Sequence, residues 1–497
     1  MKKLALIDDA FLRLENRRQP LHIGVLMMLK PPADAAPDFA FQLADRLRQH
    51  TETAPPFNQK LVSKRGLHYW EEDNHFDLNH HFVHLALPKP GRIRELLAMV
   101  SRVHSGHLDR SYPLWRMYLI EGLEDGRIAM YLKMHHAMAD GIAGITMLGK
   151  CMSNDQEASK EMLPPWAIGA RKSRRAQPPV PTPASGFTAI RALTREGYKA
   201  ITPVLKEVGG TFKDFRSGNE NLALAGQAPK CIFNQKVSAS RRFAAQSYSM
   251  PRIRAIARAF DATSNDVILA MCGGALRRYL IDRGELPKES LTAGVPVSVR
   301  RKNKQSKSNN EIAFTLTKLA THLENPAARL RAIKNCMDYN KQRMSKLSPG
   351  QLLAYAAMVM APGATNALFG RKPDKTLGNV IISHVPGPRE TMYWQGARLD
   401  GLYPVSLIID SGALNITLVS GRDTVDFGLI ACRKTVPSVQ NLLRHLEDEL
   451  TALERCVEKA RPAPLRHNTK TAGKRRKTAP APKQKVTKAV KGKASAA

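Results

Sequence analysis

The chain has 497 residues, of which 43% are apolar, so it can bury a large core and wholesale disorder is excluded. Its formal net charge is +34. Residues 461–497 hold twelve Lys or Arg and no Asp or Glu, which leaves +22 of that charge on residues 1–460. A body this basic favours anionic partners, such as a phosphate-bearing substrate, acidic lipid headgroups or nucleic acid.

Several classes of protein are disfavoured by local composition. The six cysteines are scattered and include no Cys-x-x-Cys pair, which argues against a disulfide scaffold or a zinc ribbon and fits a reducing cytosol. The first apolar run ends at Asp8 and Asp9 after four residues, too few for a signal peptide. The most apolar stretch, residues 352–361, is about half of the ~20 residues that a membrane span needs. We therefore expect a cytoplasmic protein with no signal peptide and no transmembrane helix.

Composition divides the chain into two globular regions, a connecting segment and a tail. Residues 1–165 carry alternating strand-like runs and one clear helix, and residues 231–458 read as mixed helix and strand, so each region is predicted to be a domain. Residues 166–230 begin with proline-rich, basic linker chemistry and continue as a connecting helix. Residues 459–497, rich in Lys, Ala and Pro, cannot bury a core and are predicted to be a disordered basic tail.

The motif with the clearest chemistry lies where a strand meets a helix. Residues 127–134 alternate like a strand, and residues 142–148 look like a helix with Asp140 near its N-cap. The loop between them holds His135 and His136. A neutral imidazole has a pKa close to working pH, so it can take a proton from a hydroxyl. Asp140 can fix the loop, or hold the ring through an arginine, and the N-cap position favours its ionised form.

Two plainer interpretations of this motif stay open on these residues alone. The histidines can be structural, with Asp140 acting only as a helix cap. A metal site is the other, since the upstream histidines include those at positions 80, 81, 84, 104 and 107. Adjacent histidines rarely bind one ion together, however, and neither His-Glu-x-x-His nor a Cys/His spacing occurs, so we expect no metal.

Further blocks of the first domain carry a resemblance to a known family. They are Asp9-Ala10-Phe11-Leu12 with Glu15, Pro20-Leu21-His22-Ile23-Gly24, Phe76-Asp77-Leu78 and Pro113-Leu114-Trp115. Together with the heptad that begins at His135, they resemble the bacterial wax ester synthase/acyl-CoA:diacylglycerol acyltransferase family, over residues 4–165 and 235–455. The heptad alone, HHxxxDG, is shared by the wider CoA-dependent acyltransferase superfamily, which includes peptide-synthetase condensation domains. The other blocks carry the narrower resemblance.

The second domain extends this resemblance and departs from it once. The segment Thr263-Ser264-Asn265-Asp266-Val267, which precedes a helix over residues 270–280, looks like the family's Asn-Asp motif, and residues 296–300 are similar to a family strand. The family's Asn-Val-Pro-Gly-Pro is here His384-Val385-Pro386-Gly387-Pro388, a change that bears on substrate preference. Residues 113–115 and 426–428 are expected to be packing and turn residues rather than chemistry.

The resemblance implies an α/β fold made of two chloramphenicol-acetyltransferase-like mixed-sheet domains with a channel between them. It implies transfer of a fatty acyl group from acyl-CoA to a long-chain alcohol or diacylglycerol, giving wax ester or triacylglycerol, with acyl-CoA as co-substrate and no cofactor. His136 would be the general base and His135 would support the loop. Asp140 would be structural and point to an arginine, for which Arg300 is a candidate. The amide of Asn265 can either bind a thioester oxygen or the acceptor, or serve as scaffold.

The basic tail has two candidate partners. It can hold the protein on an anionic membrane or a lipid inclusion, where each basic residue near the surface contributes ~1 kcal/mol. It can instead bind nucleic acid, although a tail without aromatic residues would bind only non-specifically and with strong salt dependence. We favour the lipid surface, which places the protein at the inner membrane face or on lipid inclusions. A solubilising extension without a partner is the third alternative.

Two rival functions also stay open. One is a condensation-type transferase of the same superfamily that uses a carrier-bound acyl group, although no fused carrier domain is evident. The other is a lipid-inclusion or nucleic-acid binding protein with an inactive acyltransferase fold. The presence of both His136 and Asp140 argues against this second rival, because an inactive copy has no chemical reason to keep both.

Overall fold

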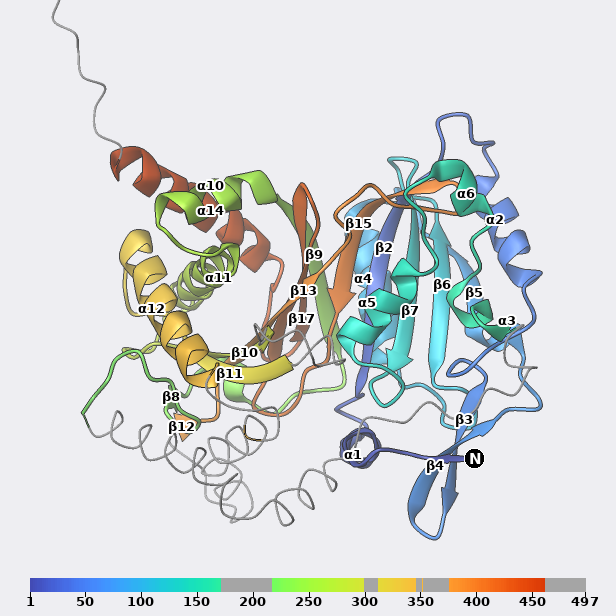
Figure 1. The fold of residues 1–497 in the computed structure, drawn as a ribbon, viewed down its shortest axis with the longest axis horizontal. Coiled ribbons are helices and arrows are strands. Elements are labelled where there is room, and N and C mark those ends of the chain that lie inside the picture. The colour runs from blue at the N-terminus through green and yellow to red at the C-terminus, as the bar shows by residue number, and fades with distance from the viewer. Residues whose placement is uncertain (171–216, 299–311, 346–350, 352–374, 461–497) are drawn as a thin grey trace, which may run out of the picture. The chain divides into compact units, whose positions relative to one another are not determined.

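The computed structural model describes residues 1–170, 217–298, 312–345, 351 and 375–460 (Figure 1). Residues 1–458 form one compact unit. The predicted basic tail, apart from its first two residues, and most of the predicted connecting segment lie outside the described residues. All six cysteines are unpaired in the structure. Among the helices of the described residues, none is long and apolar enough to cross a membrane.

The first half of the chain contributes most of one mixed sheet and the helices around it. Its elements are β1 (Lys2–Lys3), α1 (Leu6–Leu14), β2 (His22–Lys30), α2 (Phe39–Arg48), β3 (Gln59–Lys64), β4 (Leu67–Glu72), α3 (Leu78–His81), β5 (Phe82–Ala86), α4 (Ile93–Ser105), β6 (Trp115–Glu121), β7 (Ile128–His135), α5 (Gly141–Gly149), α6 (Gln156–Lys160) and the 3-10 helix η1 (Pro165–Ala167).

The described residues of the second half form another sheet and the helices that cover it. Its elements are β8 (Ala228–Pro229), the 3-10 helix η3 (Ile232–Asn234), β9 (Arg241–Ser249), α10 (Met250–Ala259), α11 (Ser264–Ile281), β10 (Thr292–Ser298), β11 (Ile312–Lys318), α12 (Pro326–Met344), β12 (Lys375–Thr376), β13 (Val380–Pro386), β14 (Tyr393–Trp394), β15 (Ala397–Val405), β16 (Leu414–Ser420), β17 (Thr424–Cys432) and α14 (Asn441–Ala460).

The first six-stranded sheet has the order β14-β15-β2-β7-β6-β5. Strand β7 lies between β2 and β6 and is buried along its whole length, which explains why its sequence is almost continuously apolar. Strands β14 and β15 belong to this sheet although they fall in the range predicted for the second domain. The pairing of β15 with β2 therefore ties the two halves of the chain together by backbone hydrogen bonds.

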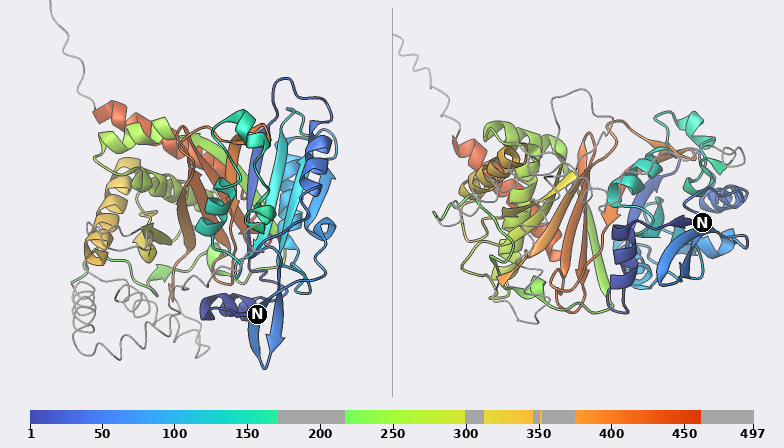
Figure 2. Two further views of the ribbon diagram at one scale, coloured as in Figure 1. Left: turned by 45° about the vertical axis from the view of Figure 1, so that its right-hand side comes forward. Right: turned by 60° about the horizontal axis from the view of Figure 1, so that its bottom comes forward.

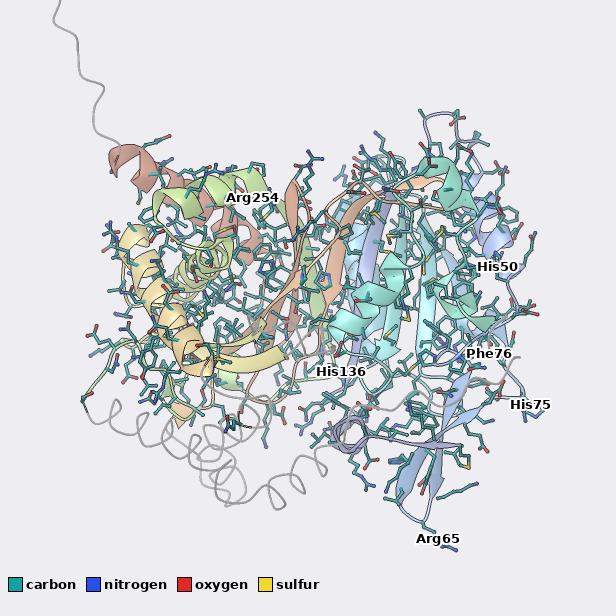
Figure 3. The ribbon with its side chains drawn as sticks, viewed as in Figure 1. His50, Arg65, His75, Phe76, His136 and Arg254 are labelled. Atoms are coloured by element: carbon teal, nitrogen blue, oxygen red, sulfur yellow. The ribbon has the colours of Figure 1, made fainter. Side chains whose placement is uncertain are left out.

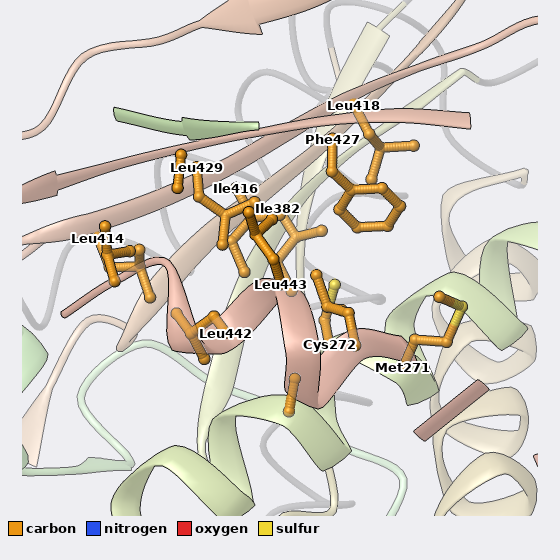
Figure 4. Packing of buried hydrophobic residues seen from close by; sticks show 14 of the residues in the cluster. Met271, Cys272, Ile382, Leu414, Ile416, Leu418, Phe427, Leu429, Leu442 and Leu443 are labelled. Carbon is orange, nitrogen blue, oxygen red and sulfur yellow. The ribbon is translucent and has the colours of Figure 1, made fainter. Parts of the chain in front are cut away.

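The second six-stranded sheet has the order β11-β10-β13-β16-β17-β9. Helices α10, α11, α12 and α14 lie on one side of it, and the first sheet lies on the other, in each view of Figures 1 and 2. The core between this sheet and its helices is apolar. In Figure 4, Leu418, Phe427 and Leu429 of the strands point toward Cys272 of α11 and Leu443 of α14.

Helix α4 of the first half packs against β9 of the second sheet, so the halves also meet away from β15. The hydroxyl of Ser105 accepts a hydrogen bond from the N–H of Arg241 at 2.9 Å, and that of Ser101 accepts one from the N–H of Phe243 at 2.9 Å. These contacts hold α4 against the second sheet.

Candidate active site

His136 is the first residue after β7, and two contacts define its position. Its N–H donates to the carbonyl oxygen of Leu21 at 3.0 Å. Its ring stacks on Phe11 of α1, with 4.1 Å between the ring centroids and 25° between the planes. Burial lowers the pKa of His136 below the ordinary histidine value, although the carboxylate of Asp140 opposes this shift. The half-buried ring is thus neutral at physiological pH, the form that a general base requires.

His135 faces away from this position and supports the loop. It is 1% exposed and lies opposite His22 in the pairing of β2 with β7. Its Nδ1 accepts a hydrogen bond from the N–H of Ala137 at 3.1 Å, so the ring proton must sit on Nε2. That Nε2 lies 3.6 Å from Oε1 of Glu15. The hydrogen bond at Nδ1 ties the ring to the backbone of the loop, and Nε2 faces the Glu15 carboxylate.

Glu15, directly after α1, is the residue of this site that sequence reasoning did not assign. Its Oε1 accepts from the N–H of Leu21 at 3.0 Å, and its Oε2 accepts from Nη2 of Arg110 at 2.9 Å. Burial works to raise the pKa of Glu15, but His135, the Leu21 N–H and Arg110 outweigh it and lower that pKa to about 2. The carboxylate therefore holds both Leu21, which binds the His136 backbone, and the ring of His135.

Asp140 caps α5, as the sequence predicted. Its carboxylate accepts from the N–H of Ala143 at 2.8 Å, which satisfies one of the free donors at the start of the helix. Among the described residues, no arginine forms an ion pair with Asp140. The predicted partner, Arg300, lies outside the described residues. The role that the structure gives Asp140 is to fix the beginning of α5 and to place a negative charge near His136.

Asn265 lies inside the first turn of α11, which begins at Ser264 rather than at the predicted residue 270. The helix starts earlier because Thr263 and Asp266 form a capping box at its N-terminus. The Oδ1 of Asn265 lies 3.3 Å from Nδ1 of His384, and burial lowers the pKa of His384 to about 4. The unusual histidine and the Asn-Asp motif thus form one contact. Among the described residues, neither side chain hydrogen-bonds His136.

An apolar pocket lies between the two sheets beside the loop. Its residues come from β2, β7, α5, β13, β15 and β16: Ile23, Gly24, Val25, Leu132, Met134, Gly141, Gly144, Ile145, Leu148, Val385, Pro404, Val405, Ser406 and Thr417. The space among them is about 490 Å³, including its open mouth. His136 is not one of the lining residues, but Met134 and Gly141, which flank it in sequence, are. The apolar lining suits part of an aliphatic chain.

The upstream histidines His80, His81 and His104 have structural contacts. The ring of His81 stacks on Trp115 at 4.6 Å and its Nδ1 lies 2.8 Å from the Trp115 carbonyl oxygen. The ring of His80 stacks on Tyr112 at 3.7 Å, and Nδ1 of His104 lies 2.6 Å from the hydroxyl of Tyr131. Within the described part of the chain, no group of three or more His, Cys, Asp or Glu side chains could hold a metal.

Comparisons with known proteins identify the family of this chain. The model of the wax ester synthase/diacylglycerol acyltransferase catalytic domain matches residues 4–268, and that of the WS/DGAT C-terminal domain matches residues 308–454. The chain is 44% identical to O-acyltransferase WSD of Acinetobacter baylyi, over 92% of this chain and 98% of that protein. It is 40% identical to a probable diacylglycerol O-acyltransferase of Mycobacterium tuberculosis, over 90% and 98%.

Solved structures give the same result for the fold. The wax ester synthase/diacylglycerol acyltransferase from Marinobacter aquaeolei VT8 is 40% identical and superposes with a TM-score of 0.75, over 92% of this chain and all of that one. The first condensation domain of the calcium-dependent antibiotic synthetase, 14% identical, has a TM-score of 0.56 over 92% and 96%, which shows a shared fold alone. The predicted α/β fold of the superfamily is confirmed, and the chain belongs to the wax ester synthase/diacylglycerol acyltransferase family.

Proposed function

We propose that this chain transfers a fatty acyl group from acyl-CoA to the hydroxyl of a long-chain alcohol or a diacylglycerol, with His136 as general base. The observation that carries the proposal is the position of His136. It is a half-buried histidine with a lowered pKa, on a loop that is fixed on both sides and flanked in sequence by residues of an apolar pocket. The names of the relatives support the same reaction class.

In the proposed reaction the acceptor oxygen attacks the thioester carbonyl carbon while a ring nitrogen of His136 takes the hydroxyl proton. The tetrahedral intermediate then breaks its C–S bond, and the imidazolium returns the proton to the departing thiolate. The products are an ester and free CoA thiol, so no covalent enzyme intermediate and no metal is required. General-base catalysis of this kind contributes ~10²–10⁴-fold in rate.

The pocket is suited to the acyl chain rather than to the CoA moiety. Its lining is largely aliphatic, with side chains such as Ile23, Leu132 and Val385, and each buried methylene contributes about 0.8 kcal/mol. The glycines of α5, Gly141 and Gly144, leave room on the helix side. We propose that the length of this pocket sets the range of acyl chains that the enzyme accepts.

Attachment to an anionic membrane or a lipid inclusion through residues 459–497 is a further part of the proposal, with nucleic acid as the alternative partner of that segment. Its support is compositional, namely the twelve basic and no acidic residues of 461–497. Asn265 as a substrate-binding residue is likewise a proposal. Its support is the contact with His384, which joins the family's Asn-Asp motif to the position where this chain differs from the family.

The experiment is CoA release by purified protein from palmitoyl-CoA, with hexadecanol or a diacylglycerol as acceptor. Wild type is compared with His136→Ala and with His75→Ala, an exposed histidine that serves as the matched control. We expect acceptor-dependent thiol release that persists in the control and falls ~10²–10⁴-fold in His136→Ala. No release from folded wild-type protein with either acceptor would refute the proposal and favour a carrier-bound donor. Full activity in His136→Ala would refute the role of this histidine.

A further inference from the structure

We propose that the outer end of the small sheet β1-β4-β3, together with the end of α1, docks this protein on an anionic lipid surface. This sheet is separate from the two large ones, and its hairpin turn between β3 and β4 carries Arg65 at its outer end (Figure 3). We name this surface the docking tip. Its residues are Met1, Lys2, Lys3, Leu14, Lys64, Arg65 and Leu67. The choice of a lipid surface as partner rests on the proposed function, but the existence of the surface does not.

The docking tip gathers three exposed aliphatic side chains from separate elements. Met1 is 59% exposed, Leu14 is 66% exposed and Leu67 is 39% exposed. Two contacts bring these elements together. Nη2 of Arg13, next to Leu14, donates to the carbonyl oxygen of Gly66, next to Leu67, at 2.6 Å. Nζ of Lys64 lies 3.1 Å from Sδ of Met1. Single exposed apolar residues are common on proteins, but Arg13 links the end of α1 to the hairpin turn and Lys64 reaches Met1, so the three share one part of the surface.

Positive charge surrounds these aliphatic side chains. Lys2, Lys3, Lys64 and Arg65 are all exposed. The carboxylate of Asp8 in α1 is the acidic group that interacts with Lys2. The acidic residues of the hairpin, Glu71 and Glu72, lie at its other end, opposite Lys60 and Gln59 in the register of β3 with β4. Lys64 and Arg65 lie at the outer end of the hairpin, and Lys2 and Lys3 lie opposite Trp70 and Tyr69, nearer to its base. Aliphatic side chains ringed by cations match a surface of anionic headgroups over acyl chains.

The opposite side of the same sheet contacts the catalytic loop. Leu61 and Trp70, which pair across β3 and β4, pack in a cluster that contains Ala137 and Met138. These two residues follow His136 directly. Helix α1 makes the second connection, because it ends beside the docking tip and its Phe11 stacks on His136. Both the small sheet and α1 therefore connect the docking tip to the catalytic loop through packed side chains.

Nucleic acid is the less suitable partner for this surface. Backbone phosphates would attract the four cations equally well, but they offer nothing to the exposed Met1, Leu14 and Leu67, and stacking of bases needs aromatic rings. Only a lipid surface would bind the aliphatic side chains, so the test removes these side chains without changing the charge.

The test measures co-flotation of the full-length protein with vesicles of phosphatidylcholine alone or of equimolar phosphatidylcholine and phosphatidylglycerol. The variants are Leu14→Ser/Leu67→Ser and Lys64→Ala/Arg65→Ala. Matched controls are Ile281→Ser, an exposed aliphatic residue at the end of α11, and Lys288→Ala/Lys434→Ala, two exposed cations of the second half. All substituted side chains are exposed, so melting curves should stay unchanged.

On the anionic vesicles we expect the partition coefficient to fall about fivefold for each cation removed from the docking tip. Loss of the two leucines should lower it about tenfold. Ile281→Ser should bind like wild type. Lys288→Ala/Lys434→Ala should bind slightly more weakly than wild type, because it lowers the total positive charge, but less weakly than Lys64→Ala/Arg65→Ala. Attachment through the basic tail alone predicts that Leu14→Ser/Leu67→Ser binds like wild type, and that result would overturn the proposal. Preferential retention of wild type by duplex DNA with no vesicle binding would overturn it as well.

Activity toward a medium-chain alcohol in detergent separates this proposal from the proposed function. The docking-tip variants should retain wild-type turnover there, because none of their residues belongs to the catalytic site. If wild type shows no turnover, the proposed function fails while the flotation result still decides the docking surface. If turnover is normal and flotation is unchanged in both variants, only the docking surface fails.

Discussion

The carboxylate of Glu15 lies 3.6 Å from Nε2 of His135, and both side chains are buried. Through Leu21, the same carboxylate also holds the strand end that binds the backbone of His136. One acid therefore controls both flanks of the predicted general base without touching the reacting atoms, which makes Glu15 a positioning residue.

Substitution of this acid should lower turnover more than substrate binding. In Glu15→Gln the amide keeps an acceptor for Leu21 but loses the charge that faces His135 and Arg110. We expect kcat to fall about 10- to 100-fold, because small displacements of a catalytic group are costly, while KM changes little. Steady-state kinetics beside Glu157→Gln, an exposed acid of α6, measures this. A rise in KM with unchanged kcat would show that Glu15 serves binding instead.

The same residue should make stability depend on pH in acid. The folded-state pKa of Glu15 is about 2, below the ordinary value of 4.5, so the unfolded chain takes up this proton first. Its contribution is complete above pH 4.5 and is lost as the pH falls from about 4.5 to about 2. Urea unfolding of Glu15→Gln should therefore vary less with pH in that window than unfolding of wild type. Parallel pH profiles of the two proteins would contradict the assignment.

The activity profile should report the environment of His136. Burial lowers the pKa of His136, so kcat/KM should rise with pH and reach its plateau below the range of an ordinary histidine. The charge of Asp140 opposes that shift, so Asp140→Asn should move the rise to still lower pH. Asparagine is as good an N-cap as aspartate, which keeps α5 intact in this variant. A profile that moves to higher pH would exclude this electrostatic role of Asp140.

Gly144 offers a direct test of the pocket. A Cβ built there meets no atom within 4 Å, and the residue lines the apolar pocket from α5. Gly144→Leu should fold and should lower kcat/KM for palmitoyl-CoA by about tenfold or more, through the loss of ~1–3 kcal/mol of chain burial, with a smaller effect on octanoyl-CoA. Gly149→Leu, on the same helix but outside the pocket, is the control. Equal losses with both donors would place the acyl chain elsewhere.

Gly428 offers a test of how β15 is held in place. A Cβ on Gly428 of β17 would lie 1.8 Å from the carbonyl oxygen of Pro404 in β15. Gly428→Ala must push the two strands apart, and we expect ~1–3 kcal/mol of lost stability with a lower melting temperature. Gly421→Ala, whose Cβ would approach no closer than 3.5 Å, should melt like wild type. Equal melting temperatures would mean that β15 can shift without cost.

The sequence by itself determined the local architecture of the site. Alternation over residues 127–134 and a capping acid at Asp140 depend only on near neighbours, and β7 and α5 formed where these signals predicted them. The heptad and its companion blocks also sufficed to predict the family. Helix α11 begins at Ser264, six residues before the predicted residue 270, because Thr263 and Asp266 form a capping box at its N-terminus.

Tertiary structure alone decided the rest, because the deciding contacts join distant parts of the chain. Strand β15 joins the first sheet by pairing with β2, and a short apolar segment carries no local mark of which sheet it will enter. Glu15 resembles any acid after a surface helix until the fold brings Leu21, Arg110 and His135 around it. Burial makes these contacts necessary, because a charged side chain removed from water needs partners that only the folded chain supplies.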